Sequence, residues 1–150
     1  MKLSGYTTPP RLVYAQMKAR GGGVIVNDIG AAGERMNADY ITGSTGNAAL
    51  MAFTRALGGK SLKDNIRVVG INPGPVETER MTGRLKAQAK ERFGDDSRYM
   101  EFTRDMPRGR AARPREIADM MAFLASDRSD YTTGVIVTID GGLSAGGGAM

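Results

Sequence analysis

Three short apolar runs, each followed by turn-forming residues, dominate the hydropathy pattern of this chain. They occupy residues 24–27, 66–71 and 135–139. A Pro-Gly turn follows the second run, and a Gly-Gly pair follows the third. Short runs that are apolar at nearly every position are typical of strands buried on both faces of a parallel sheet. The pattern therefore predicts three buried strands.

Apolar residues with helical spacing separate these runs. A hydroxyl N-cap before two prolines predicts a helix start at Thr8, and glycine runs at 21–23 and 58–59 predict the ends of the first two helices. The predicted helices cover residues 10–20, about 40–57, 79–106 as one or two charged helices with breaks near Gly94 and Pro107, and 114–125.

The alternation of helices and apolar strands predicts an α/β fold. Such connections produce a parallel sheet with helices on both faces, and three strands make only about half of a typical sheet. A chain of 150 residues is one domain by size. The helix at 40–57 is apolar nearly all round, which predicts that a second subunit covers part of it in a homo-oligomer.

The composition excludes several kinds of chemistry. The chain has no cysteine and no histidine, so thiolate nucleophiles, disulfides and the commonest general base and metal ligand are absent, and we expect no metal site. No apolar run approaches the ~20 residues needed to span a bilayer, and no signal peptide is recognisable at the start. We therefore expect no membrane partner and a cytoplasmic location.

The net charge of +5 is concentrated in one segment. Eleven of the 21 basic residues lie between Arg80 and Arg115. Nucleic-acid binding calls for interleaved aromatic residues, and the segment offers only Phe93, Tyr99 and Phe102. We expect no nucleic-acid partner and favour a solvated charged segment. The alternative, that its arginines meet phosphate or an acidic substrate, stays open.

Four stretches, in this order, resemble the short-chain dehydrogenase/reductase family. They read MKARGGGVIVN, NAALMAFTRALGGKSL, IRVVGINPGPVET and ARPREIADMMAFLASDRSDYTTGVIVTIDGG. The resemblance implies that residues 1–142 form the C-terminal portion of a Rossmann-like, doubly wound parallel sheet, followed by a flexible Gly-rich tail at 143–150. It also implies NAD or NADP as cofactor and a small alcohol or ketone as substrate.

The phosphate loop of that family has no counterpart here. It follows a strand and opens a helix, where backbone N–H groups hold the pyrophosphate. The glycines at 21–23 instead follow a predicted helix. The first, nucleotide-binding half of the sheet is therefore expected to be missing, and this chain alone should bind NAD(P) weakly or not at all.

The catalytic positions of the family also differ in this sequence. Matched without gaps, the family's serine falls on Gly30, its tyrosine on Gly43 and its lysine on Asn47. A substitute set is Tyr40, Ser44 and Asn47, whose spacing places them on one face of a helix. The alternative is that Tyr40 is a packing residue and Ser44 a helix cap.

The loop after the second predicted strand is the expected cofactor contact. By resemblance, Pro73, Gly74, Val76 and Thr78 would close over the nicotinamide, with the Thr78 hydroxyl bonding its carboxamide or a phosphate. The alternative for Thr78 is a helix N-cap.

Two functional hypotheses follow from the sequence. The first is a truncated or weakly active homologue of NAD(P)-dependent oxidoreductases that move a hydride to or from an alcohol or ketone. The second is a non-catalytic module of the same fold that serves in dimerisation or binding, because the proton-transfer positions read Gly30, Gly43 and Asn47.

Overall fold

The structure, a computed structural model, describes residues 2–146 and contains one parallel three-stranded sheet. Its strands are β1 (Gly23–Asp28), β2 (Ile66–Pro73) and β3 (Ile136–Ile139), in the order β1-β2-β3. Ile25 pairs with Val68, and Ile71 pairs with Val137. The predicted parallel arrangement of the three strands is confirmed.

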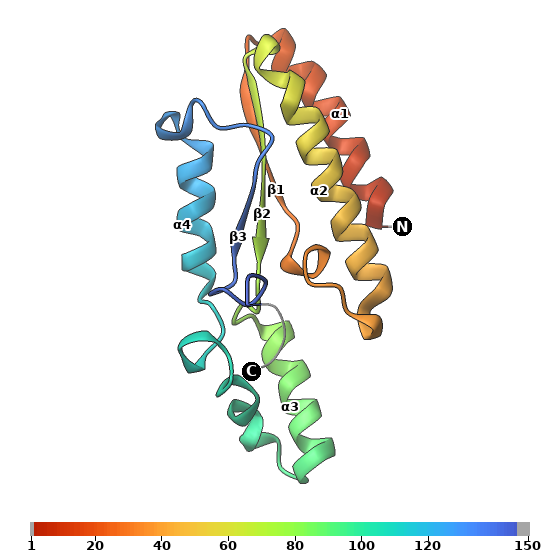
Figure 1. Cartoon of the computed structure of the whole chain (residues 1–150), viewed down its shortest axis with the longest axis vertical. Coiled ribbons are helices and arrows are strands. Elements are labelled where there is room, and N and C mark those ends of the chain that lie inside the picture. The colour runs from red at the N-terminus through yellow and green to blue at the C-terminus, as the bar shows by residue number, and fades with distance from the viewer. Residues whose placement is uncertain (1, 147–150) are drawn as a thin grey trace.

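Within residues 2–146 there are four helices, three of which cover the sheet in two layers. They are α1 (Lys2–Ala19), α2 (Ile41–Ser61), α3 (Glu79–Phe93) and α4 (Pro114–Ala125). Helices α1 and α2 cover one face and α4 covers the other, while α3 lies beyond the end to which β2 points (Figure 1). The predicted breaks near Gly94 and Pro107 are confirmed, because α3 ends at Phe93 and short 3₁₀ segments cover Asp96–Thr103 and Pro107–Gly109.

The core divides according to the alternation of side chains along β2. Val69 and Ile71 pack with Ile117 and Leu124 of α4. On the opposite face, Ile66 and Val68 form a cluster with Ile25, against which Tyr14, Met17 and Leu57 of α1 and α2 pack. A strand buried by both layers is why residues 66–71 are continuously apolar except for one arginine and one glycine.

That arginine, Arg67, is 5% exposed and fastens α4 to the sheet. Its guanidinium donates to the carbonyl oxygens of Leu124 at 2.7 Å and Ser126 at 2.9 Å, and to the Ser129 hydroxyl at 2.9 Å. The two carbonyl acceptors lie at the C-terminal end of α4, where helix carbonyls lack partners within the helix, and Ser129 belongs to the 3₁₀ turn that follows. Arg67 thus supplies hydrogen-bond donors to these acceptors and holds the C-terminal end of α4 against the sheet.

Two predicted helix boundaries were wrong. Helix α1 already begins at Lys2 and runs through Thr8, Pro9 and Pro10 to Ala19, so these prolines lie inside the helix and not in its first turn. Helix α2 continues through Gly58 to Ser61. A Cβ at Gly58 would collide with the Gly134 backbone and lie 2.7 Å from the Val68 oxygen, so this glycine serves close packing rather than helix termination.

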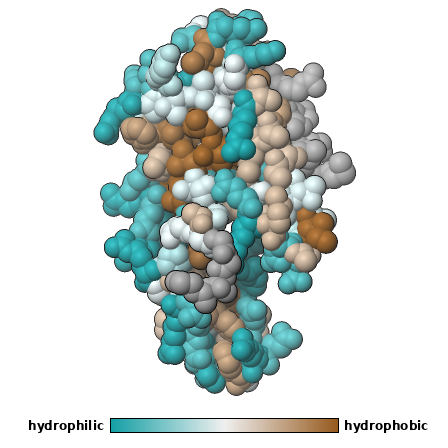
Figure 2. Space-filling view, in the orientation of Figure 1, coloured by the Kyte–Doolittle hydropathy of each residue, from teal (hydrophilic) through white to brown (hydrophobic). Residues whose placement is uncertain are grey.

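Hydrophilic and hydrophobic side chains occupy different parts of the surface. In the space-filling view, hydrophilic side chains cover much of the end formed by α3, and a hydrophobic patch lies higher, between α4 and the α1–α2 layer (Figure 2). Among residues 2–146, no helix has the length and apolar character required to cross a membrane. The predicted flexible tail falls partly outside the described residues, at 147–150.

Candidate functional site

The loops that follow the three strands meet at one edge of the sheet. They are the segment from Ile29 to Tyr40 after β1, residues 74–78 after β2, and the turn beginning at Asp140 after β3. In open α/β sheets, ligands bind in the crevice beyond the carboxyl ends of the strands. A ligand site is therefore expected at this edge.

A cavity of about 900 Å³ lies there, which we call the strand-end cavity. Its walls come from all three loops and from the first turns of α3. Most residues predicted for the site line it: Tyr40, Asn47, Pro73, Gly74, Val76 and Thr78, together with Gly30. The predicted catalytic and cofactor-contacting groups are thus brought together, with Ser44 as the exception.

Tyr40 occupies the space next to Gly43. It is 47% exposed, precedes the first residue of α2 and lines the strand-end cavity. A Cβ added to Gly43 would fall on the Tyr40 ring itself. Glycine at position 43 is therefore what allows the ring of Tyr40 to lie where a side chain at 43 would begin.

Asn47 and Gly30 form the neighbouring wall. Asn47 is 3% exposed, and its Nδ2 donates to the Gly30 carbonyl oxygen at 3.1 Å. Gly30 has φ of 113°, and a Cβ there would lie 3.1 Å from Nδ2 of Asn47. This contact fixes the loop after β1 against α2. Two of the three positions matched to the family's catalytic residues, Gly30 and Asn47, thus line the cavity, and the third, Gly43, adjoins it through the Tyr40 ring.

Ser44 has a supporting position. It is buried at 4% exposure inside α2 and does not line the strand-end cavity. Its hydroxyl accepts from the Asn37 N–H at 3.4 Å and so holds the segment that leads into Tyr40. Ser44 does not cap the helix, because α2 begins at Ile41.

Thr78 is the N-cap of α3. Its Oγ1 accepts from the Met81 N–H at 3.3 Å, as the alternative interpretation of the sequence expected. The residue also lines the strand-end cavity. Because a hydroxyl both donates and accepts, capping leaves its proton available to a ligand.

Asp140 lies at the centre of the site, although it was not among the residues predicted for the site from the sequence. Its carboxylate accepts from the N–H groups of Gly142 at 2.8 Å and Ser144 at 2.7 Å. Burial by itself raises the pKa of Asp140, but these hydrogen bonds outweigh it and lower the pKa. A Cβ on Gly74 would lie 2.7 Å from the Asp140 Cβ, so glycine there lets the loops after β2 and β3 touch. In the sequence, the Asp-Gly-Gly turn directly after a buried strand was the one pattern that pointed to Asp140.

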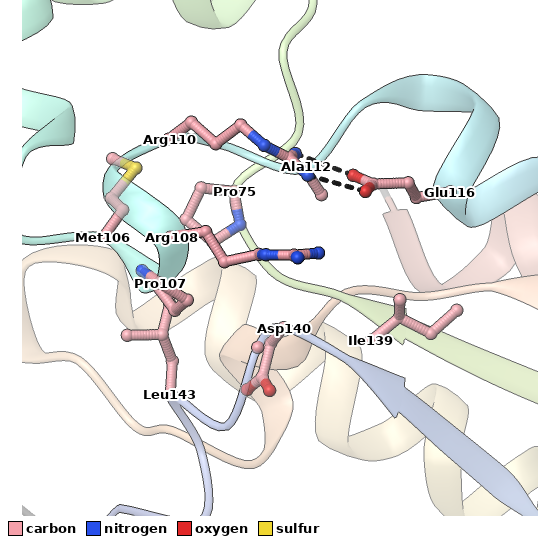
Figure 3. Close-up of a pocket in the computed structure, with 11 residues that line it drawn as sticks. Pro75, Met106, Pro107, Arg108, Arg110, Ala112, Glu116, Ile139, Asp140 and Leu143 are labelled. Atoms are coloured by element: carbon pink, nitrogen blue, oxygen red, sulfur yellow. Dashed lines mark hydrogen bonds and ion pairs between the residues drawn. The ribbon is translucent and has the colours of Figure 1, made fainter.

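A second hollow of about 400 Å³ adjoins the strand-end cavity, with Pro75, Asp140 and Leu143 lining both. Figure 3 shows the Arg110 guanidinium paired with Glu116 on one of its walls. Glu116 accepts from Arg110 at 2.7 and 2.8 Å and from the Arg113 N–H at 2.7 Å. The guanidinium, followed by the N–H, lowers the pKa of Glu116 to about 2.

Replacing Glu116 by glutamine should destabilise the protein in a pH-dependent way. The folded-state pKa lies below the ordinary 4.5, so the carboxylate's contribution is fully present above about pH 4.5 and is lost as the pH falls toward 2. Melting temperatures of parent and Glu116→Gln should therefore differ near pH 7 and converge below pH 3. Glu91→Gln, at an exposed position of α3, is the control. A difference that persists unchanged at pH 2 would contradict this account.

Groups typical of other sites are lacking in the part of the chain that the structure describes. No three acidic side chains gather there as a metal ion would require. Gly21 and Gly22 lie between α1 and β1 and Gly23 begins β1, all at the opposite end of the strands from the strand-end cavity. Within residues 2–146, this edge therefore has no glycine-rich turn that leads from a strand into a helix, the arrangement that holds a pyrophosphate.

Comparison with known proteins identifies the class. A family model described as enoyl-(acyl carrier protein) reductase matches residues 2–144, and the chain belongs to this group within the short-chain dehydrogenases/reductases. A 3-oxoacyl-[acyl-carrier-protein] reductase of Thermotoga maritima is 32% identical over 143 residues, which are 95% of this chain and 54% of that protein.

Solved structures agree with this assignment. The L-sorbose reductase of Gluconobacter frateurii, complexed with NADPH and L-sorbose, is 34% identical and superposes with a TM-score of 0.81 over 88% of this chain and 51% of its own. An NAD⁺-bound xylitol dehydrogenase is 27% identical, with a TM-score of 0.82 over 94% and 56% of the two chains. The chain thus spans about half the length of the relatives that it matches.

Proposed function

We propose that this chain forms the substrate side of an NAD(P)-dependent oxidoreductase that interconverts a small ketone and an alcohol. The observation that supports it is the ring of Tyr40, which lies over Gly43 inside the strand-end cavity. Gly43 is the position where the resemblance expects a catalytic tyrosine. Tyr40, three residues earlier in the sequence, would place a tyrosine hydroxyl in the same region of the cavity.

In this proposal Tyr40 exchanges a proton with the substrate oxygen. It lines the strand-end cavity and is exposed enough to meet a ligand there. Asn47 fixes the neighbouring wall through its bond to Gly30, and Ser44 fixes the segment before Tyr40. The bound nicotinamide would supply or accept the hydride, and residues 73–78 would contact that end of the cofactor.

The expected weakness of cofactor binding follows from the missing pyrophosphate site. We expect the isolated chain to bind NADH and NADPH with a Kd above about 1 mM, because the nicotinamide end alone offers few contacts. Joining it to the amino-terminal half of the Thermotoga maritima reductase should restore binding to the micromolar range and produce turnover on a panel of ketones. Calorimetric titration and cofactor absorbance measure the two quantities.

The possible results separate the two functional hypotheses. If the isolated chain bound NADH or NADPH with micromolar affinity, the proposal that it lacks a pyrophosphate site would be wrong. Tight cofactor binding without turnover in the joined protein would favour the non-catalytic binding module instead. Self-association through α2 and a cytoplasmic location remain predictions; light scattering of the same samples would detect the former.

A further inference from the structure

Three arginines line the strand-end cavity without partners. Arg35 comes from the loop after β1, and Arg80 and Arg84 come from α3. Within the described residues, none of the three guanidinium groups makes a hydrogen bond or an ion pair. They therefore bring three positive charges to the cavity without local compensation.

Little negative charge lines the strand-end cavity. Asp140 is the one acidic residue that lines the strand-end cavity within residues 2–146. Its carboxylate is already occupied by the N–H groups of Gly142 and Ser144. An anion entering the cavity thus meets guanidinium groups and no free carboxylate.

The placement of the α3 pair is unfavourable for the helix alone. Arg80 and Arg84 are four residues apart, so they share one face, and like charges at this spacing destabilise a helix. Within the described residues, three arginines have a carboxylate partner: Arg98 with Glu101 and Arg110 with Glu116 at 2.7 Å each, and Arg115 with Asp119 at 3.8 Å. A ligand that carries negative charge would supply the missing partner.

We infer that the strand-end cavity selects a carbonyl compound that bears a carboxylate or phosphate group, held by Arg80 and Arg84 from one wall and by Arg35 from the other. The carbonyl group of this ligand is inferred from the proposed function, whereas its anionic group is inferred from the arginines alone. Guanidinium matches both oxyanions with paired N–H donors. The cavity, at about 900 Å³, is large enough for such a metabolite beside a nicotinamide.

Two matched ligand pairs test this on the chain as it is. 2-Oxoglutarate is compared with its dimethyl ester, and dihydroxyacetone phosphate with dihydroxyacetone, by calorimetry or NMR titration. In at least one pair the anion should bind tenfold or more tightly than the neutral compound. Arg80→Gln and Arg84→Gln should each remove about tenfold of that affinity, with Arg80→Lys keeping part of it. The melting temperature should stay constant or rise, because the like-charge pair is removed.

The control is Arg55→Gln, an exposed arginine of α2 outside the cavity, which should leave binding unchanged. Equal affinity within both pairs would overturn the inference, and so would an equal loss in Arg55→Gln, which would indicate net charge alone. Arginine-dependent binding of inorganic pyrophosphate but of neither organic anion would assign these residues to the cofactor and also overturn it. Selective anion binding without turnover in the joined protein would refute the proposed reaction and leave anion recognition standing.

Discussion

Replacing Tyr40 by phenylalanine should lower the kcat of the joined protein by roughly 10²- to 10⁴-fold, the usual contribution of a positioned acid–base group. Phenylalanine keeps the ring that lies over Gly43, so the packing at that position and the shape of the cavity are retained. The KM for the ketone should change little, because only the proton donor is removed. Steady-state kinetics with saturating cofactor measure both constants.

Two further variants make this expectation specific. Gly43→Ala should cause a comparable loss with the Tyr40 hydroxyl still present, since its Cβ would displace the ring. Tyr131→Phe changes a tyrosine that is 97% exposed and lies outside the strand-end cavity, so activity should be unaffected. Equal, substantial activity in parent and Tyr40→Phe would reject Tyr40 as the proton donor.

Replacing Gly58 by alanine should destabilise the fold by about 2–3 kcal/mol, although alanine normally favours a helix by about 1 kcal/mol over glycine. The new Cβ would collide with the Gly134 backbone and lie 2.7 Å from the Val68 oxygen. Both neighbours are backbone atoms, so no side-chain rotation can relieve the contact. For a chain of this size the melting temperature should fall by about 3 °C per kcal/mol.

The next residue in the same helix is the matched control. A Cβ on Gly59 would meet nothing within 4 Å, so Gly59→Ala should show only the gain in helix propensity, about 0.5–1 kcal/mol. A loss of stability in Gly58→Ala and a gain in Gly59→Ala would distinguish the effect of close packing from that of helix propensity. Stabilisation by both substitutions, measured by thermal or urea unfolding, would contradict the packing account.

Gly58 also illustrates what sequence patterns predict and what they miss. The three strands and α4 were predictable because burial imposes their apolar periods directly on the sequence. The end of α2 was not, because a glycine pair is typical of a helix end, and only the approach of residue 134, far along the chain, shows its other use.

The candidate site divides in the same way. Residues 73–78 were predictable because a Pro-Gly turn after a buried strand is a local signal. The position of Tyr40 over Gly43 depends on how a loop meets a helix, and the role of Asp140 depends on N–H groups that follow it. The arginines of α3 could be noted from the sequence, but their direction toward the cavity required the fold.

The strand register has a consequence for how this chain folds. Gly23 pairs with Ile66, and Gly70 pairs with Ile136, so each pairing in the sheet closes a long loop. Contacts so distant in sequence slow folding, because loop-closure entropy is lost before the contacts form. During synthesis β2 must wait for β3 until α3 and α4 have been made, with its outer row of N–H and C=O groups exposed. That interval is when the growing chain is most open to pairing with the wrong strand.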